Sequence, residues 1–197
     1  MLNEAVPGIQ WTFGGGSAMA HVYGHRISYD ADIFLHDVQA LTYLSPRLND
    51  VAASLAEHYD EQANGIKLTT GRGDIDFVVA ADVTTAPPQP VSIPGIAGPV
   101  QMQDAAEILA KKIQYRGVYF THRDMFDLAM LLQQSPPSVD LAFAQCAPGA
   151  VAQAVDAMRL RLPVLTVELP GYVNPTPGFR HLLVDAEKIL AEFLKRI

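Results

Sequence analysis

Alternating hydrophobic and polar positions near the N-terminus predict short β-strands around a glycine-rich turn. The run GIQWTF is rich in β-forming residues and ends at three consecutive glycines, which is typical of a strand that enters a tight turn. Ser17 then begins a short helix that we expect to stop at Gly24. In ISYDADIFL, apolar side chains alternate with Ser28, Asp30, Asp32 and Phe34. This period of two predicts a strand with one polar face.

The next part of the chain is predicted to hold one long helix and then a hairpin. Ser45 and Pro46 supply an N-cap and a first helical residue, and the pattern runs to Asn64-Gly65, which indicates a helix stop. The runs IKLTT and DIDFVVAADV are β-rich and are joined by a glycine-bearing turn, which predicts a β-hairpin. The proline-rich stretch from Thr85 to Pro99 excludes a helix or a central strand and indicates a domain boundary.

Helical spacing dominates from Asp104 onward. Asp104 and Glu107 fit a capping box at the start of the first of these helices. The sequence therefore predicts an α/β or α+β fold, in which an N-terminal half at 1–99 with a small sheet is followed by a helical half at 100–197 that packs on it. Helices are expected at about 103–116, 122–134, 138–146, 149–161 and 179–196.

Composition narrows the class of protein. A chain of 197 residues that is 49% hydrophobic can bury a substantial core, which excludes disorder of the whole chain. No apolar run reaches the length of about 18 residues that a membrane span needs, and MLNEAVPG lacks the features of a signal peptide, so we expect a cytoplasmic protein without a membrane partner. The net charge of −7 argues against a protein that coats nucleic acid non-specifically. Cys146, the one cysteine, excludes an intramolecular disulfide and is expected to be buried.

Paired carboxylates carry the first chemical hypothesis. On a strand, Asp30 and Asp32 would point to the same face about 6.6 Å apart and could hold divalent cations between them. Asp76 is the candidate third ligand, because DIDFVV alternates in the same way. Oxygen-only ligands favour Mg²⁺ or Mn²⁺. Two such ions about 4 Å apart can activate a hydroxyl and stabilise the pyrophosphate that leaves a nucleoside triphosphate. The alternative is an Asp-x-Asp pair that only solvates a turn or a strand.

A phosphate-binding turn is the second hypothesis. Gly15 and Gly16 would let backbone amides approach a phosphate, while the Ser17 hydroxyl donates to it at a helix N-terminus. A plain strand-to-helix turn would look the same. Lys112 and Arg116 are spaced i,i+4, so they repel each other on one helix face unless an anion such as a triphosphate lies between them.

Other charged residues leave several roles open. Arg26 is expected to bind a phosphate or a carboxylate, although a surface arginine would read the same way. Arg123 and Asp127 are spaced for an intrahelical ion pair, and Asp124 could act as a base, a ligand or a strut. His21 and His25 lack a third ligand at a suitable spacing, which disfavours a zinc site.

These motifs together resemble the AbiEii-like family of bacterial nucleotidyltransferase toxins. The similar blocks are Gly15-Gly16-Ser17-Ala18, then Gly24-His25-Arg26-x-Ser28-x-Asp30-x-Asp32-x-Phe34, Glu107-Ile108-Leu109-Ala110-Lys111-Lys112 and Arg123-Asp124-x-x-Asp127-Leu128. They reach from about Phe13 to Leu132 in the expected order. The family commonly has threonine where Ser17 stands, and its helical part is often longer.

The resemblance implies a polymerase-β-like nucleotidyltransferase core with a small mixed sheet, which transfers a nucleotide from an NTP in the presence of Mg²⁺ or Mn²⁺. It further implies tRNA 3′ ends as the acceptor and an antitoxin as the partner. By the same resemblance, Asp30 and Asp32 would hold metal, the glycine turn with Ser17 would hold phosphate, and Lys112 would contact the triphosphate. Two alternatives stay open, namely the same chemistry on a protein or small-molecule acceptor, and a non-catalytic nucleotide-binding module.

Overall fold

The computed structural model describes residues 8–197. The first seven residues of MLNEAVPG, where we expect no signal peptide, lie outside the described residues. Contacts divide the chain into two units, each discontinuous in sequence. We call them the sheet unit (Met1–Ala18, Ser28–Ala81 and Pro87–Gln103) and the helical unit (Met19–Ile27, Asp82–Ala86 and Asp104–Ile197). A residue such as His25 thus belongs with the C-terminal helices, although it precedes most of the strands. The expected division into domains at 1–99 and 100–197 stays a prediction.

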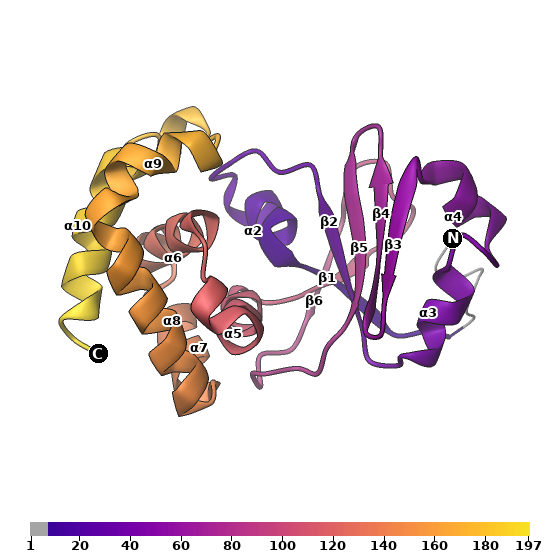
Figure 1. The fold of residues 1–197 in the computed structure, drawn as a ribbon, viewed down its shortest axis with the longest axis horizontal. Helices are drawn as coiled ribbons and strands as arrows, with labels where there is room; N and C mark the ends of the chain where they lie inside the picture. Colours follow the sequence, from indigo (N-terminus) through magenta and orange to yellow (C-terminus); the bar gives the residue numbers. More distant parts are fainter. Residues whose placement is uncertain (1–7) are drawn as a thin grey trace. The chain divides into compact units, whose positions relative to one another are not determined.

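The sheet unit is built on a seven-stranded mixed sheet in the order β3-β4-β5-β2-β1-β7-β6 (Figure 1). Its centre pairs β1 with β2 in antiparallel and β2 with β5 in parallel orientation. The predicted strand before the glycines and the hairpin of β4 and β5 are confirmed. The strand expected over ISYDADIFL is shorter than predicted, because β2 begins at Ala31, so Asp32 lies on the strand and Asp30 lies in the loop before it. Strand bounds are β1 Trp11–Gly14, β2 Ala31–Leu35, β3 His58–Gln62, β4 Gly65–Thr70, β5 Gly73–Val79, β6 Gln89–Val91 and β7 Val100–Met102.

The two faces of this sheet differ in chemistry. Ile33, Phe77 and Ile66 are Cα partners across β2, β5 and β4, and they pack with two short helices, α3 (Gln39–Leu44) and α4 (Asp50–Leu55), into a hydrophobic core (Figure 1). Side chains alternate along a strand, so the neighbouring positions face the other way. The next row of Cα partners, on that opposite face, is Gly14, Asp32, Asp76, Lys67 and Asp60. The sheet therefore has an apolar face for packing and a charged face for chemistry.

The single helix expected from Ser45 to Asn64 is wrong. The segment holds only α4, which begins after the N-cap Asn49, and then β3. The Ser45 hydroxyl, read as a helix cap, donates instead to Glu61 on β3. The Asn64-Gly65 pair, read as a helix stop, joins β3 to β4, where Gln62 pairs with Gly65. An Asn-Gly pair can end a helix or form a hairpin turn, and here the pairing of β3 with β4 makes it a turn.

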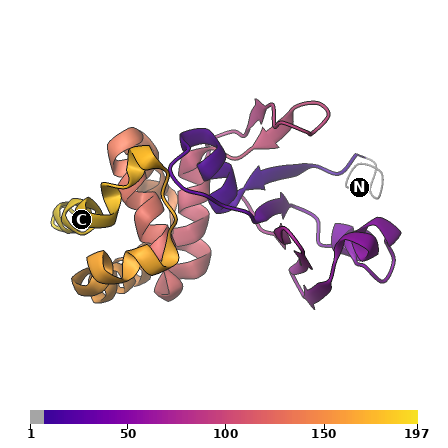
Figure 2. The same cartoon turned by 90° about the horizontal axis from the view of Figure 1, so that it is seen from above.

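The proline-rich segment forms no helix and no central strand, as its composition predicts, but it does contain a short edge strand. It contains β6, which lies at an edge of the sheet and pairs with β7, and β7 pairs with β1 in parallel orientation (Figure 2). Proline is tolerated on an edge strand because no ladder hydrogen bond is needed on the outer side. These two three-residue strands were not predicted.

The helical unit confirms the expected helical C-terminal half. The Asp104 side chain caps α5, but Glu107 does not complete the expected capping box, because its carboxylate accepts from Val83 and Thr84. Helix α9 was not predicted, since Pro170 and Gly171 within it obscure the pattern. The helices are α2 Gly15–Tyr23, which starts in the sheet unit, α5 Ala105–Arg116, α6 His122–Gln134, α7 Pro136–Gln145, α8 Pro148–Arg161, α9 Leu165–Tyr172 and α10 Leu182–Leu194.

The predicted fold class, a mixed α/β sheet with a helical C-terminal half, is thus confirmed. Within residues 8–197, no helix combines the length and the apolar character needed to cross a bilayer.

Candidate active site

The turn between β1 and α2 depends on glycine at Gly15. Its φ of +66° is a left-handed conformation that other residues rarely adopt. A Cβ atom built on Gly15 would lie 1.9 Å from Oδ2 of Asp32, so the Asp32 carboxylate occupies the space where a side chain would stand. Gly15 also begins α2, whose N-terminus favours a negative charge. The turn therefore brings the helix N-terminus and a predicted metal ligand into contact.

Ser17 and Asp30 shape the loop that enters β2. The Ser17 hydroxyl donates to the backbone carbonyl of Asp30 and lies 2.7 Å from the Ser28 hydroxyl. In turn, Oδ1 of Asp30 accepts from the backbone N–H of Asp74, 3.2 Å away. These contacts tie the β1–α2 turn to the start of β5. Ser17, expected to bind phosphate, thus has a role in orienting the Asp30 loop.

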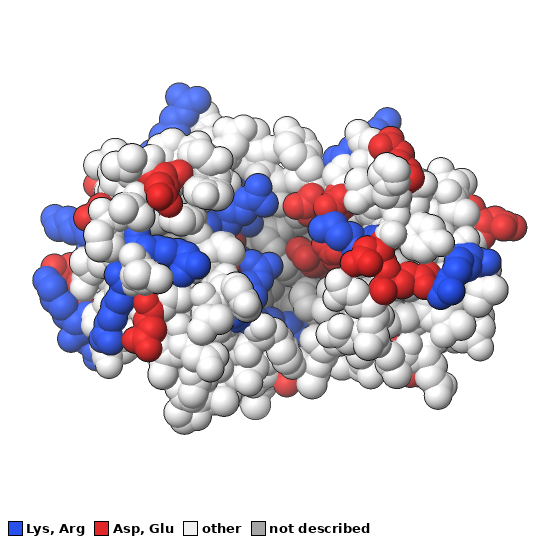
Figure 3. Space-filling model, in the orientation of Figure 1, with Lys and Arg blue, Asp and Glu red and all other residues white. Residues whose placement is uncertain are grey.

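Asp32 and Asp76 form the centre of the charged face. They are Cα partners in the parallel pair of β2 and β5, so their side chains leave the sheet on the same side. Figure 3 shows Asp and Glu side chains gathered on the sheet unit around a basic side chain. The structure therefore brings together, in one unit, the predicted residues Gly15, Gly16, Ser17, Asp30, Asp32 and Asp76.

Lys67 and Asp74 belong to this face and were missed as site residues. Nζ of Lys67 lies 2.9 Å from Oδ2 of Asp74 and 3.7 Å from Oδ2 of Asp76. Asp74 lies two residues before Asp76 on β5 and so on the same face, and nothing in the run IKLTT distinguishes its lysine. Only the pairing of β4 with β5, in which Lys67 is the partner of Asp76, reveals the contact.

The charged environment changes the proton affinity of Asp76. Burial raises the pKa of its carboxyl, Lys67 opposes this, and the nearby negative charges of Asp74 and Asp30 add to the increase, so that the pKa lies above its ordinary value. A carboxylate with a raised pKa is a stronger base. Asp74 shows the reverse, because its hydrogen bond with Lys67 lowers its pKa.

The donor set on this face fits a hard divalent cation. Asp30, Asp32 and Asp76 offer only carboxylate oxygens, and burial together with the negative charges of Asp74 and Asp30 raises the pKa of Asp76. Among residues 8–197 there is no group of three or more His, Cys, Asp or Glu side chains arranged as a ready metal site. Mg²⁺ commonly takes one or two protein carboxylates and completes its shell with water and substrate phosphates. The residues present match that mode of binding.

In the helical unit, Asp127 is the centre of a buried ion network. Its carboxylate accepts from Nε2 of His25 at 2.7 Å, from Nε of Arg26 at 2.8 Å and from Nζ of Lys112 at 2.5 Å. Asp127 is completely buried, and Lys112 exposes only 6% of its side chain. Burial would raise the pKa of Asp127, but Lys112, His25 and Arg26 outweigh it and hold the pKa well below its usual value.

The network answers questions that the sequence left open. Arg26 binds a carboxylate, and the expected pair of Arg123 with Asp127 is wrong, because Nε of Arg123 donates to the carbonyl of Tyr172. Burial disfavours a charge on Lys112, yet Asp124 and Asp127 raise its pKa, so the ammonium stays charged. Contact of Lys112 with a triphosphate stays a prediction.

Asp124 serves as a strut at the start of α6. It is completely buried, and its carboxylate accepts from Nζ of Lys112, from Arg116 and from both the N–H and the hydroxyl of Thr121, with which it forms a capping box. Burial would raise the pKa of Asp124, but Lys112 and Arg116 lower it overall. Arg116 keeps 47% of its side chain exposed while it contacts Asp124.

Lys111 is held in an ion pair, and Cys146 is buried as expected. Lys111 pairs with Glu107 at 3.2 Å, as the i,i+4 spacing predicts. Cys146 is buried, and burial together with Glu107 raises its pKa to about 11, which keeps the thiol protonated at neutral pH.

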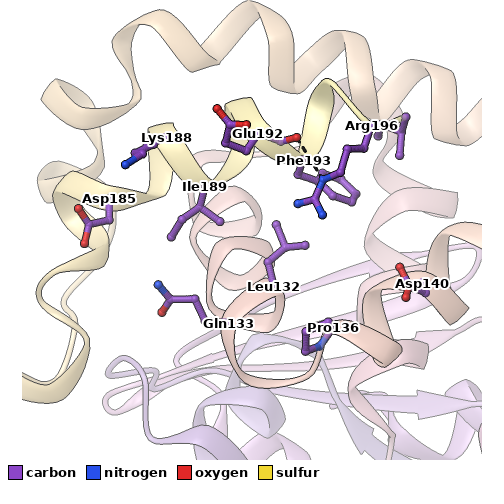
Figure 4. A pocket seen from close by; sticks show the side chains of 11 residues that line it. Leu132, Gln133, Pro136, Asp140, Asp185, Lys188, Ile189, Glu192, Phe193 and Arg196 are labelled. Atoms are coloured by element: carbon purple, nitrogen blue, oxygen red, sulfur yellow. Dashed lines mark hydrogen bonds between the residues drawn. The ribbon is translucent and has the colours of Figure 1, made fainter.

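A groove of about 780 Å³ lies wholly within the helical unit, between the end of α6, the start of α7 and α10 (Figure 4). Its charged lining residues have both signs, with Asp140, Asp185 and Glu192 beside Lys188 and Arg196. None of the predicted site residues lines it. The charged face of the sheet unit is therefore the better candidate for chemistry.

Comparisons with solved structures give distant similarities. A nucleotidyltransferase-like antigenic protein from Paracoccidioides brasiliensis shares 15% identity at a TM-score of 0.43, with 88% of this chain and 89% of that chain covered. The enzyme ANT(2'')-Ia, solved with adenylyl-2''-tobramycin, shares 17% identity at a TM-score of 0.38, with 86% and 93% covered. A STING-associated c-di-GMP synthase from Capnocytophaga granulosa shares 12% identity at a TM-score of 0.31, with 98% and 73% covered.

A comparison with curated protein sequences finds no match. The family described as "Nucleotidyl transferase AbiEii toxin, Type IV TA system" matches residues 2–170, which include every predicted site residue. This agrees with the resemblance carried by the glycine turn, the Asp30 and Asp32 pair and the Lys112 segment. The chain belongs to the AbiEii toxin family and is a nucleotidyltransferase.

Proposed function

We propose that this nucleotidyltransferase transfers a nucleoside monophosphate from an NTP to the 3′ end of a tRNA, with Mg²⁺ as cofactor, and that it acts in the cytoplasm as a toxin restrained by an antitoxin. The observation that carries the proposal is the placement of Asp32, which is in register with Asp76 and lies against the Gly15 turn. Carboxylates for a cation and a glycine turn for phosphate are thereby adjacent on one face.

The residues of the sheet unit divide the work of nucleotidyl transfer. Asp30, Asp32 and Asp76 would hold the divalent ion, which when bound would stabilise negative charge on the triphosphate and on the leaving pyrophosphate. Backbone amides at Gly15 and Gly16 would orient the phosphates at the N-terminus of α2. The raised pKa of Asp76 suits it to accept the proton of the attacking hydroxyl.

The helical unit contributes charge and rigidity to this proposal. Arg116 is half-exposed and would bind phosphate oxygens, as the i,i+4 spacing with Lys112 suggested. Lys112 would add positive potential from within the network, although Asp124 and Asp127 already hold its ammonium. Arg26 and Asp124 would keep this arrangement fixed, because each is tied to a buried partner.

The direct test is transfer of label from an NTP to RNA. Wild-type protein, Asp32→Asn and Asp76→Asn are incubated with Mg²⁺, each α-labelled NTP in turn, and total tRNA. Wild-type protein should label tRNA, and Asp32→Asn and Asp76→Asn should lose at least about a hundredfold in rate, as typical of lost transition-state charge stabilisation. Asp60→Asn is the matched control, because Asp60 lies in the same row of the sheet but on the edge strand β3. Equal labelling by Asp32→Asn and wild type would reject the proposed site.

The choice of acceptor and the toxin role need separate measurements. Replacing tRNA with a protein extract or with small-molecule alcohols distinguishes the other acceptors, and NTP binding without consumption would indicate a non-catalytic module. For the toxin role, induced expression should arrest growth with wild-type protein and not with Asp32→Asn. Growth arrest that persists in Asp32→Asn would separate toxicity from nucleotidyl transfer.

A further inference from the structure

Lys67 places a basic group inside the carboxylate cluster of the sheet unit. Its ammonium lies 2.9 Å from Asp74 and 3.7 Å from Asp76, and its Cα atom is the register partner of that of Asp76. The contact therefore follows from sheet geometry, because any long side chain at this position would lie over the same face.

The electrostatics indicate that Lys67 compensates more than one acid. Its hydrogen bond with Asp74 raises its pKa, burial opposes this, and the negative charges of Asp76, Asp74 and Asp30 raise it further. Three carboxylates thus share one ammonium. A divalent cation on this face would bring twice that charge to the same acids. It would therefore compete with the Lys67 ammonium as their counter-ion.

The Lys67 side chain is also able to move away from Asp76. It keeps 45% of its side chain exposed, and an ammonium on a flexible four-carbon stem can move without a change in the backbone. Asp74, its nearest partner, is the acid of the cluster that the nucleotidyl-transfer proposal does not use as a metal ligand. A lysine held through Asp74 can stay close to the site after it leaves Asp76.

We propose that Lys67 is a positioning residue, a resident counter-ion that keeps Asp74 and Asp76 in place while no divalent ion is bound and yields Asp76 when one arrives. This rests on the proposed function, since it assumes that Asp76 helps to hold Mg²⁺. It predicts an antagonism between Lys67 and the metal that can be measured without any turnover.

The test is thermal unfolding of the full chain in EDTA and across a titration with MgCl₂ or MnCl₂, without nucleotide. Lys67→Met should lower the Tm in EDTA, because the acids then repel one another without a counter-ion. The same variant should gain more Tm from the metal than wild type, with a midpoint at about fivefold lower metal concentration, which corresponds to the loss of one half-exposed ion pair. Lys67→Arg, which keeps the charge, should behave like wild type.

Two further variants keep the test decisive. Lys195→Met removes a lysine with a comparable contact, 2.8 Å to Glu192, and should leave the metal response unchanged. Lys67→Gln should reproduce Lys67→Met if the latter folds poorly. Equal metal responses in wild type and in both neutral Lys67 variants would overturn the role of Lys67 alone. A wild-type protein whose Tm does not respond to metal, in the same way as Asp32→Asn, would instead overturn the proposed metal site on which it rests.

Discussion

At the scale of single residues, Gly15 links backbone conformation to charge. We expect Gly15→Ala to cost about 1–2 kcal/mol of stability through its positive φ, and to reduce nucleotidyl transfer far more. The larger effect on transfer follows because the new methyl group would displace the Asp32 carboxylate, which lies 1.9 Å from the ideal Cβ position. Chemical denaturation and the tRNA-labelling rate measure the two effects.

The matched control for this substitution is Gly149→Ala. Gly149 lies in the first turn of α8, has no atom within 4 Å of an added Cβ, and does not have a positive φ. Its replacement should leave both stability and transfer near wild type. If Gly15→Ala were as harmless, the close approach of Asp32 to the turn would have no consequence for function.

Asp127, in contrast, is a carboxylate that stabilises the fold. Asp127→Ala should destabilise the protein by about 3–5 kcal/mol, because it leaves Lys112, Arg26 and His25 buried without their shared partner. Asp127→Asn keeps the shape and should cost less. Urea unfolding followed by circular dichroism gives the difference, and a loss below about 1 kcal/mol for Asp127→Ala would contradict the network.

At the scale of secondary structure, α6 depends on its first turn. The Thr121 hydroxyl accepts from the N–H of Asp124 at 3.2 Å, while Asp124 accepts from the N–H of Thr121 at 2.9 Å. Thr121→Ala should cost about 1–2 kcal/mol, whereas Thr121→Ser should be near neutral because the hydroxyl remains. Thermal unfolding compares the two variants. Similar losses for both would assign the effect to the methyl group.

Elements were predictable wherever one period governed the pattern. The alternation around Asp32 and the helical spacing from Asp104 to Gln134 both gave the observed elements. The 45–64 segment failed because β3, with the sequence HYDEQ, has no apolar side and is held by pairing with β4. Such a strand has no periodic signal of its own, since its stabilisation comes from a partner distant in sequence.

The candidate site was predictable to the extent that it lies in short motifs. Asp30, Asp32 and the glycines could be named from their spacing, and Asp76 from its own strand. Lys67 could not, because only the register of β4 against β5 brings it to the acids. His25 was considered only as a metal ligand, while the structure makes it a partner of Asp127 that is 102 residues away in sequence. Spacing predicts neighbours within one element and cannot predict contacts between elements.

At the scale of the whole molecule, the lowered pKa values of Asp124 and Asp127 make stability depend on pH. A carboxyl group whose pKa is lower in the folded state stabilises the fold above its unfolded pKa of about 3.9, and this contribution is lost as pH falls through the folded value. The free energy of unfolding should therefore decrease steadily below about pH 4. Asp127→Asn removes one of these groups and should flatten the slope, which urea titrations at a series of pH values would measure. An unchanged slope in this variant would show that other acids control the acid transition.

The two edges of the sheet have a consequence for how the protein behaves at high concentration. An exposed outer strand offers free backbone groups to any other chain and so invites intermolecular β-structure. Here one margin is β3, whose side chains include Asp60 and Glu61, and the other is β6, which carries Pro90. Charge repels an incoming copy at the first margin, and a missing N–H interrupts the ladder at the second. Both margins therefore discourage the stacking of copies into fibrils.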